Sequence, residues 1–283
     1  MLIEALLDEI IVRALQEDLA GGDLSAEACV DPARKARARA LAKSPLVVAG
    51  GAVFRRVFEL VDATTEVYLD AADGSRASDR ACIWRVEGTA RSLLMAERTA
   101  LNFVQRMSGV ATLANACVDA LPKDSPTRIT DTRKTTPGLR ALERYAVRVG
   151  GAHNHRNDLG AAVMIKDNHI VAAGGIAQAV ERARRFAPHT SRVELEVASM
   201  DELEQALASG ADIIMLDNFD DEAVKAAVTR VASVTPRPLI EASGGITLER
   251  IHRLGLLGVD VISVGALTHS AKAADISLEL ELV

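Results

Sequence analysis

The sequence predicts an α/β fold: an incomplete α/β barrel that follows a smaller N-terminal domain of mixed helix and strand. Three observations predict it. From about residue 110 onward, short apolar runs recur, and each ends in polar or charged residues. Most intervals between these runs have helical spacing. Aromatic residues make up only 3% of the chain. Buried strands that alternate with helices indicate βαβ units and a parallel sheet.

The first hundred residues show no repeat and indicate a small α+β domain. Residues 1–18 have the spacing of an amphipathic helix that stops before Gly21 and Gly22. Three β-like runs follow, over 36–42, 46–53 and 81–87. Residues 92–115 then predict a long helix, which we expect Gly109 to bend or split.

The rest of the chain predicts five or six βα units. The apolar runs cover 127–134, 162–168, 193–199, 212–218, 238–245 and 261–267. Helical patterns cover 201–209, 221–232 and 247–254. Consecutive units with no change of spacing favour a closed barrel over an open doubly wound sheet. A full eight-fold barrel takes roughly 250 residues, so we expect an incomplete one.

Charge and composition exclude several classes of function. The chain has 283 residues and a formal net charge of −6, which argues against nucleic-acid or anionic-membrane binding. No apolar run approaches the roughly 20 residues that span a bilayer. The first ten residues carry acids where a secretory signal would carry bases. Cys29, Cys82 and Cys117 are scattered and odd in number, so we expect neither disulfides nor a zinc site, and a cytoplasmic location.

One stretch of this acidic protein is basic. Residues 128–169 contain eight Arg or Lys against four Asp or Glu, with three histidines. A solvated basic face is the ordinary interpretation of such a stretch. The predicted strand ends argue against it, because active sites of α/β barrels lie where the strands end. The predicted strand ends are Asp131, Arg133, Lys134, Lys166, Glu196, Asp217, Glu241, Ser243 and Gly265.

The first group of candidate site residues is cationic: Arg133, Lys134, His155, Arg156 and Lys166. Arginine binds carboxylate or phosphate through two contacts, whereas lysine supplies a compact charge. Gathering these cations costs free energy through repulsion, which a multiply charged anion would offset. A histidine such as His155 is more often structural, but its place beside Arg156 favours a role in function. We therefore predict a pocket for small polyanions.

The second group is anionic and consists of Glu196 and Asp217, at neighbouring strand ends. Two carboxylates suit Mg²⁺ bound partly through substrate phosphates. They could equally stabilise a developing sugar cation or act as acid and base. The alternative is that they only pair with Lys134 and Lys166.

The third group is backbone: Ser243, Gly244 and Gly245 before a helix, and Val264, Gly265 and Ala266 after the last strand. Glycine-rich turns that enter helices present N–H groups to phosphate. A double glycine is a common turn, but late barrel loops are a recurrent phosphate site.

Several motifs resemble the quinolinate phosphoribosyltransferase family, also called nicotinate-nucleotide pyrophosphorylase (carboxylating). They are DTRKTTPGLR at 131–140, RYAVRVGGAHNHR at 144–156, MIKDNHI at 164–170, IMLDN at 214–218, EASGGI at 241–246 and SVGALTHS at 263–270. EDLAGGDLS at 17–25 and AERTALNFVQRMSGVAT at 96–112 match the N-terminal half of the family. The resemblance covers essentially the whole chain in the expected order.

The resemblance implies that quinolinate and phosphoribosyl pyrophosphate become nicotinate mononucleotide, pyrophosphate and carbon dioxide, with Mg²⁺. It implies an N-terminal α/β sandwich over 1–110, joined by 270–283, and a barrel over 111–269. It also implies a homodimer with shared active sites, with further assembly into hexamers left open.

The resemblance also assigns roles to residues. Thr132, Arg133, Lys134, His155, Arg156 and Lys166 would bind quinolinate and nearby phosphates. Arg98 of AERT would reach across from the partner subunit. Glu196 and Asp217 would face the ribose and the metal pyrophosphate, and with Lys134 and Lys166 would form the catalytic set. Residues 243–245 and 264–266 would hold the 5′-phosphate. Glu241 acquires no role.

The sequence departs from the family pattern beside His155 and Arg156. Ala152 stands where a third glycine is usual, Asp158 lies near a position where glycine is common, and Ala161 replaces an acid. These departures bear on the shape of the pocket and on its substrate preference. A separate alternative is a ModD-like paralogue associated with molybdate transport, which has the same fold. Nicotinate phosphoribosyltransferase needs only one carboxylate to be recognised, which fits the cationic group less well. A barrel that only binds a phosphate ligand would not need Glu196 and Asp217.

Overall fold

The computed structural model describes residues 4–283, which divide into two compact units. The first unit holds the described chain up to Asn115 together with Thr135–Gly151 and Ala266–Val283. The second unit holds Ala116–Lys134 and Ala152–Gly265. The first three residues of the predicted helix at 1–18 lie outside the described part of the chain. No helix within residues 4–283 is long and apolar enough to cross a membrane.

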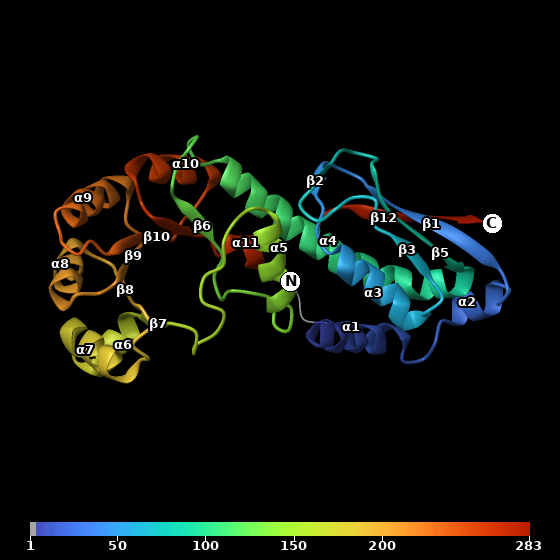
Figure 1. Ribbon diagram of the computed structural model, residues 1–283, viewed down its shortest axis with the longest axis horizontal. Coiled ribbons are helices and arrows are strands. Elements are labelled where there is room, and N and C mark those ends of the chain that lie inside the picture. The colour runs from blue at the N-terminus through green and yellow to red at the C-terminus, as the bar shows by residue number, and fades with distance from the viewer. Residues whose placement is uncertain (1–3) are drawn as a thin grey trace. The chain divides into compact units, whose positions relative to one another are not determined.

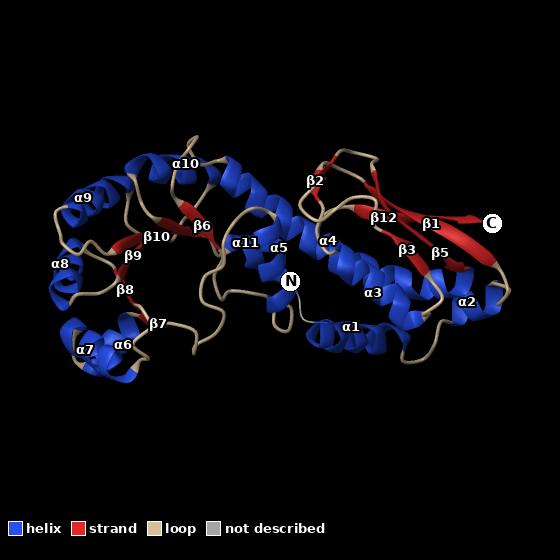
Figure 2. Ribbon diagram, viewed as in Figure 1, coloured by secondary structure: helices blue, strands red, loops and turns tan. Residues whose placement is uncertain are grey.

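The first unit is built on an antiparallel sheet in the order β12-β1-β5-β3 (Figure 2). Its strands are β1 (Lys35–Ala42), β3 (Glu66–Tyr68), β5 (Cys82–Thr89) and β12 (Ile276–Leu282). A second, two-stranded sheet pairs β2 (Leu46–Val47) with β4 (Arg76–Ala77). The helices are α1 (Glu4–Leu19), α2 (Leu24–Cys29), α3 (Gly51–Val61), α4 (Ala90–Asp119), α5 (Arg140–Val149) and α11 (Ala266–His269). The last four residues of α4 belong to the second unit.

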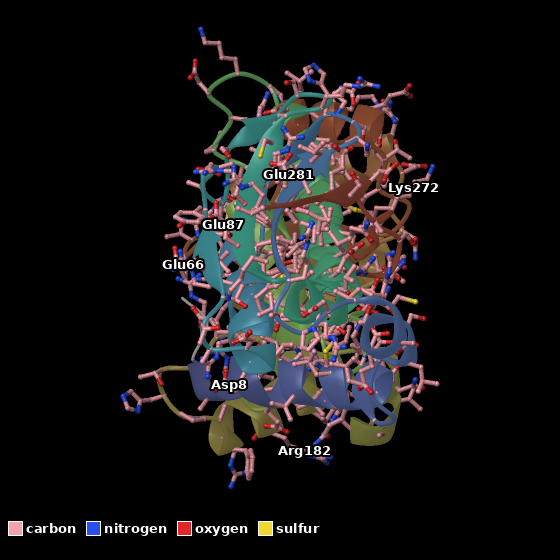
Figure 3. The ribbon with its side chains drawn as sticks, turned by 90° about the vertical axis from the view of Figure 1, so that its right-hand side faces the viewer. Asp8, Glu66, Glu87, Arg182, Lys272 and Glu281 are labelled. Carbon is pink, nitrogen blue, oxygen red and sulfur yellow. The ribbon has the colours of Figure 1, made fainter. Side chains whose placement is uncertain are left out.

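The sequence of strand β1 explains why one face of this sheet is exposed to solvent and the other is buried. Its sequence KARARALA alternates exposed basic residues with buried alanines. Arg37 lies opposite Glu87 of β5 and Glu281 of β12, and Glu87 lies opposite Glu66 of β3. Figure 3 labels the three acids of this row. Arg37 lies 3.8 Å from the Glu87 carboxylate and 4.0 Å from that of Glu281, and exposed ion pairs of this kind add little to stability.

The second unit is a parallel six-stranded sheet in the order β6-β11-β10-β9-β8-β7. Its strands are β6 (Arg128–Thr130), β7 (Val163–Ile165), β8 (Val193–Val197), β9 (Ile213–Asp217), β10 (Leu239–Ser243) and β11 (Val261–Ser263). Its helices are α6 (Asp167–Ala173), α7 (Ile176–Phe186), α8 (Met200–Ser209), α9 (Asp221–Ala232) and α10 (Leu248–Leu257). Figure 1 shows α8, α9 and α10 along the outer side of the curved sheet.

The predicted fold class is confirmed: the parallel sheet with its helices is an incomplete α/β barrel, and an N-terminal part with an antiparallel sheet precedes it. Among the described residues β6 and β7 are the two ends of the sheet and do not pair. A single parallel bridge between Thr130 and His153 places the 153–156 segment beside β6. The bridge therefore brings His153, in the middle of the basic stretch, next to the last residue of β6.

The predicted strand over 46–53 is wrong beyond Val47, because helix α3 begins at Gly51. The backbone N–H groups of Gly50 and Gly51 each donate to the Asp73 carboxylate at 3.0 Å. Gly50 takes a left-handed conformation, with φ of 104°. The helix therefore starts on an acceptor that is 22 residues distant in the chain, which no local pattern indicates.

The predicted bend at Gly109 is also wrong, because α4 runs unbroken from Ala90 to Asp119. A Cβ atom at Gly109 would lie 2.0 Å from the carbonyl oxygen of Lys272. The N–H of Ala274 donates to the carbonyl oxygen of Gln105 at 2.8 Å. The glycine thus lets the C-terminal segment cross the helix closely and return to the first sheet as β12.

We predict that Gly109→Ala destabilises the protein. Alanine favours a helix over glycine by about 1 kcal/mol, but here its methyl group would displace the backbone at Lys272. Overpacking of this kind typically costs about 1–3 kcal/mol. Urea denaturation should show the loss, with Asn102→Ala on the exposed side of α4 as the control. Equal stability of Gly109→Ala and the wild-type protein would contradict this packing.

We predict that the three thiols differ in reactivity. Cys29 and Cys82 are exposed, whereas Cys117 is buried, and burial raises the pKa of its thiol to about 11. The thiolate is the reactive form, so iodoacetamide at pH 8 should alkylate Cys29 and spare Cys117 until the chain is unfolded. Peptide mass spectrometry gives the extent at each site. If Cys117 in the native protein is alkylated as fast as Cys29, the buried environment described for Cys117 is contradicted.

Candidate active site

The predicted site residues of the second unit lie at the carboxyl ends of its parallel strands. The positions are Thr132, Arg133 and Lys134 after β6, Lys166 after β7, Glu196 near the end of β8, Asp217 ending β9, Ser243 ending β10, and Val264 and Gly265 after β11. Because parallel strands end at one edge of a sheet, these residues share that edge. Arg98 lies exposed on α4, and Ala266 begins α11, both in the first unit.

Lys166 and Glu196 form an ion pair between neighbouring strands. The ammonium Nζ of Lys166 donates to Oε2 of Glu196. The Glu196 side chain is 16% exposed and that of Lys166 is 43% exposed, so the pair opens to solvent on the lysine side. This is the pairing that the sequence left open as an alternative to a role in chemistry. A pair of this kind can separate when an anion binds the ammonium.

The turn after β10 is shaped around Asp217. Asp217 and Ser243 are partners in the register of β9 and β10. Asn218, at φ of 55°, donates its backbone N–H to the carbonyl oxygen of Ser243 at 2.9 Å. Its side-chain amide donates to the carboxylate of Asp217 at 2.8 Å. A Cβ atom at Gly244 would lie 2.1 Å from Oδ1 of Asn218, so only glycine fits there.

Helix α10 follows this turn and points its first N–H groups toward it. Thr247 caps the helix by accepting the N–H of Arg250 at 3.2 Å. The Arg250 guanidinium donates to the carbonyl oxygen of Gly244 at 2.6 Å and thus locks the turn to the helix. A glycine turn before a helix is a common anion site, and the predicted phosphate role of residues 243–245 fits it.

Two arginines of the predicted cationic group lie close enough to repel each other. Burial lowers the pKa of the Arg156 guanidinium, and the positive charge of Arg133 lowers it further. The Arg156 guanidinium also donates to the carbonyl oxygen of Ala162 at 3.1 Å. Like charges held together in a partly buried place favour the binding of an anion between them.

Asp131 ties the 153–156 segment to the end of β6. Its carboxylate is fully buried and accepts the side-chain amide of Asn154 at 2.6 Å. It also accepts the backbone N–H of His155 at 2.8 Å. The sequence placed Asp131 at a strand end but gave it no task. Its task in the structure is to hold the backbone that carries His155 and Arg156.

A histidine and two glutamates form a buried trio, which we call the His155 trio: His155, Glu194 of β8 and Glu241 of β10. Nε2 of His155 lies 3.3 Å from a carboxylate oxygen of Glu194 and 3.4 Å from one of Glu241. Burial lowers the pKa of His155, but the two carboxylates outweigh it and raise that pKa to about 10. Burial also raises the pKa of Glu194. The two acids thus attract a proton to this part of the site.

The contact made by the other ring nitrogen of His155 shows which of the two nitrogens carries a hydrogen. Nδ1 accepts the backbone N–H of Arg156 at 2.7 Å. That bond requires a bare Nδ1, so in this geometry the ring hydrogen lies on Nε2, facing the carboxylates. Glu194 was not predicted from the sequence. Its only signal was an acid in the middle of the apolar strand VELEV.

The residues offer two sets of candidate metal ligands. The ligand atoms of the His155 trio lie within 4.8 Å of one another, as a cation site would need. However, a histidine that binds metal through one nitrogen usually donates a hydrogen from the other, and here Nδ1 is an acceptor. We therefore interpret the trio as hydrogen-bonded. Glu196 and Asp217, both partly exposed at strand ends, offer the oxygen ligands that Mg²⁺ prefers.

The three departures from the family motifs lie close to Arg156 in sequence and form ordinary local structure. Ala152 is buried, with 5% of its surface exposed. Asp158 is exposed and accepts the N–H of Gly160 at 2.9 Å, which closes a turn. Ala161 is exposed. None of the three removes a charged residue of the predicted site.

Two family models together cover most of the chain. The quinolinate phosphoribosyl transferase C-terminal domain matches residues 110–279, and the N-terminal domain of the same family matches residues 23–108.

Relatives of known structure or curated name agree with the family models. The probable nicotinate-nucleotide pyrophosphorylase [carboxylating] of Bacillus subtilis is 41% identical over 98% of this chain and 94% of its own length. The human nicotinate-nucleotide pyrophosphorylase [carboxylating] is 43% identical over 94% of this chain and 89% of its own length. The crystal structure of NadC from Streptococcus pyogenes is 43% identical, covers 100% of this chain and 99% of its own, and superposes with a TM-score of 0.94. With cations, paired acids and a glycine turn at the strand ends, and with these matches over nearly its whole length, the chain belongs to the quinolinate phosphoribosyl transferase family.

Proposed function

We propose that this protein transfers the phosphoribosyl group of phosphoribosyl pyrophosphate to quinolinate. The transfer releases pyrophosphate, and decarboxylation then gives nicotinate mononucleotide and carbon dioxide, a step of NAD biosynthesis. The observation that carries the proposal is the placement of the family's charged motifs at one edge of the parallel sheet, in a chain 41% identical to a relative named for this reaction. Relatives named in this way do not favour the ModD-like alternative.

The arginines and lysines of the cationic group would bind the carboxylates of quinolinate and the phosphates. Arg133 and Arg156 repel each other in the protein without substrate, so an anion between them would relieve the repulsion. Lys166 would exchange its pairing with Glu196 for a substrate anion. Lys134 and Thr132 lie on the same loop after β6. The turn at 243–245 and the residues 264–266 would hold the 5′-phosphate.

The two acids would act on the ribose. As the ring nitrogen of quinolinate approaches the anomeric carbon and pyrophosphate leaves, positive charge develops on the sugar. Glu196, freed from Lys166, and Asp217 would stabilise that charge by lying on the same strand edge. When carbon dioxide then leaves the nucleotide that has formed, the positively charged ring nitrogen would stabilise the electron pair left on the adjacent ring carbon, and that carbon would take up a proton from solvent to give nicotinate mononucleotide.

We include Mg²⁺ in the proposal. The carboxylates of Glu196 and Asp217 would hold it, in part through water and through the pyrophosphate, where it would neutralise the charge of the leaving group.

We also include a homodimer with shared active sites. Arg98 is exposed on α4 and belongs to the first unit, whereas the strand-end residues belong to the second. Arg98 of one subunit would complete the cationic group of the other. A cytoplasmic location completes the proposal, in keeping with cysteines that are free thiols.

The first test is the reaction itself. We expect the purified protein to form nicotinate mononucleotide and carbon dioxide from quinolinate, phosphoribosyl pyrophosphate and Mg²⁺, in equal amounts. Chromatography of the nucleotide and trapping of the carbon dioxide released from labelled quinolinate measure both products. Product from nicotinate in place of quinolinate, or no product with either acid, would refute the proposed function.

The second test concerns the cations. We expect Arg133→Ala and Lys166→Ala each to lower kcat/KM by about 10²- to 10³-fold, because each removes a charge that stabilises the transition state. Arg182→Ala is the control: Arg182 is exposed on α7 (labelled in Figure 3) and belongs to no predicted group, so this variant should keep wild-type turnover. Near-normal turnover of both Arg133→Ala and Lys166→Ala would contradict the assigned roles.

A further inference from the structure

The His155 trio lies on the inner side of the parallel sheet. Glu194 belongs to β8 and Glu241 to β10, and β9 lies between these strands. Both carboxylates nonetheless reach Nε2 of the same imidazole, so both point to one side of the sheet. The outer side carries α8, α9 and α10 (Figure 1). Inner positions of α/β barrels are ordinarily filled by branched apolar side chains, so two acids there are unusual.

The two acids cost the fold free energy. The side chain of Glu194 is 5% exposed and that of Glu241 is 3% exposed. In each, Oε1 is buried and has no hydrogen-bond partner among the described residues. Buried carboxyl groups with an oxygen left unsatisfied are destabilising compared with apolar side chains of the same size. A role in stability therefore does not account for Glu194 and Glu241.

What the acids hold is the segment that carries Arg156. Through Nε2, His155 is tied to β8 and β10, and through Nδ1 it accepts the backbone N–H of Arg156. Asp131 fixes the backbone N–H of His155 itself. Both ring nitrogens are thus engaged within the protein. The imidazole therefore links the two glutamates on the inner side of the sheet to the backbone of Arg156 at the carboxyl ends of the strands.

We propose that Glu194 and Glu241 are positioning residues for quinolinate binding: they hold the His155 ring, and the ring holds the backbone of Arg156 so that its guanidinium meets a substrate carboxylate. The proposal rests on the proposed function for the identity of the substrate. It gives Glu241 a task, and it makes His155 a support for Arg156 rather than a direct ligand of quinolinate.

Kinetics of Glu241→Met separate positioning from mere stability. Methionine has similar size and no acceptor, and His155 keeps Glu194 as a partner at 3.3 Å in this variant, so no buried charge is left without a partner. We expect a folded variant with a melting temperature close to the wild-type value. Its KM for quinolinate should rise about tenfold, as for the loss of one buried hydrogen bond, while its KM for phosphoribosyl pyrophosphate changes little.

Two further variants sharpen this test. Glu241→Gln keeps an acceptor oxygen at the same place and should recover most of the quinolinate affinity, and Glu194→Met should repeat the effect of Glu241→Met. Glu249→Ala, exposed on α10, is the control and should match the wild-type protein. Equal rises of KM for both substrates, or a loss of stability without any change of KM, would overturn the proposal.

A spectroscopic readout needs no substrate and therefore separates this proposal from the proposed function. Nitrogen NMR of histidine-labelled protein reports the hydrogens on each ring, and His155→Gln identifies the signals of His155. We expect a hydrogen on Nε2, a bare Nδ1, and a shift of the Nε2 signal in Glu241→Met. A hydrogen on Nδ1, or an Nε2 signal unchanged in that variant, would overturn the positioning role. An inactive wild-type protein with the expected signals would refute only the proposed function and the quinolinate assignment.

Discussion

Parallel pairing brings the carboxyl ends of six strands to one edge of the second unit, and the chemistry of this protein depends on that constraint. Residues far apart in sequence become neighbours there because each strand contributes one or two side chains as it ends. Lys166 pairs with Glu196 from the next strand, and Asp217 stands in register with Ser243. The helices that follow the strands present N–H groups at the same edge. A polyanionic substrate would meet both kinds of group at once.

Repulsion between like charges and pairing between opposite charges both shape the site. Arg133 lowers the pKa of Arg156, and Lys166 is held by Glu196. An incoming anion would relieve the repulsion between Arg133 and Arg156 and would displace Glu196 from Lys166. The Glu196 carboxylate would then be available when positive charge develops on the ribose. Below the edge, Nε2 of His155 contacts the carboxylates of Glu194 and Glu241. The site therefore combines like charges that repel each other with opposite charges that pair.

The sequence predicted the barrel well because its strands are short, apolar and followed by charged residues, a pattern that repeats. The sequence also predicted that the strand-end residues lie near one another, because parallel strands end at the same edge of a sheet. It failed where structure depends on distant partners. Helix α3 starts on Asp73, and Gly109 serves the crossing of Lys272 rather than a bend. Glu194 escaped notice because a buried acid looks like any other residue of its strand until His155 is placed beside it.

A crystal structure with quinolinate bound would test the account most directly, because it shows which groups meet the two carboxylates. We predict contacts from the Arg133 and Arg156 guanidiniums and from Lys166, which will have left Glu196. Nε2 of His155 should still face Glu194 and Glu241, and Nδ1 should still accept the N–H of Arg156. Quinolinate bound away from the strand ends, or a His155 ring turned from the glutamates to a substrate carboxylate, would contradict it.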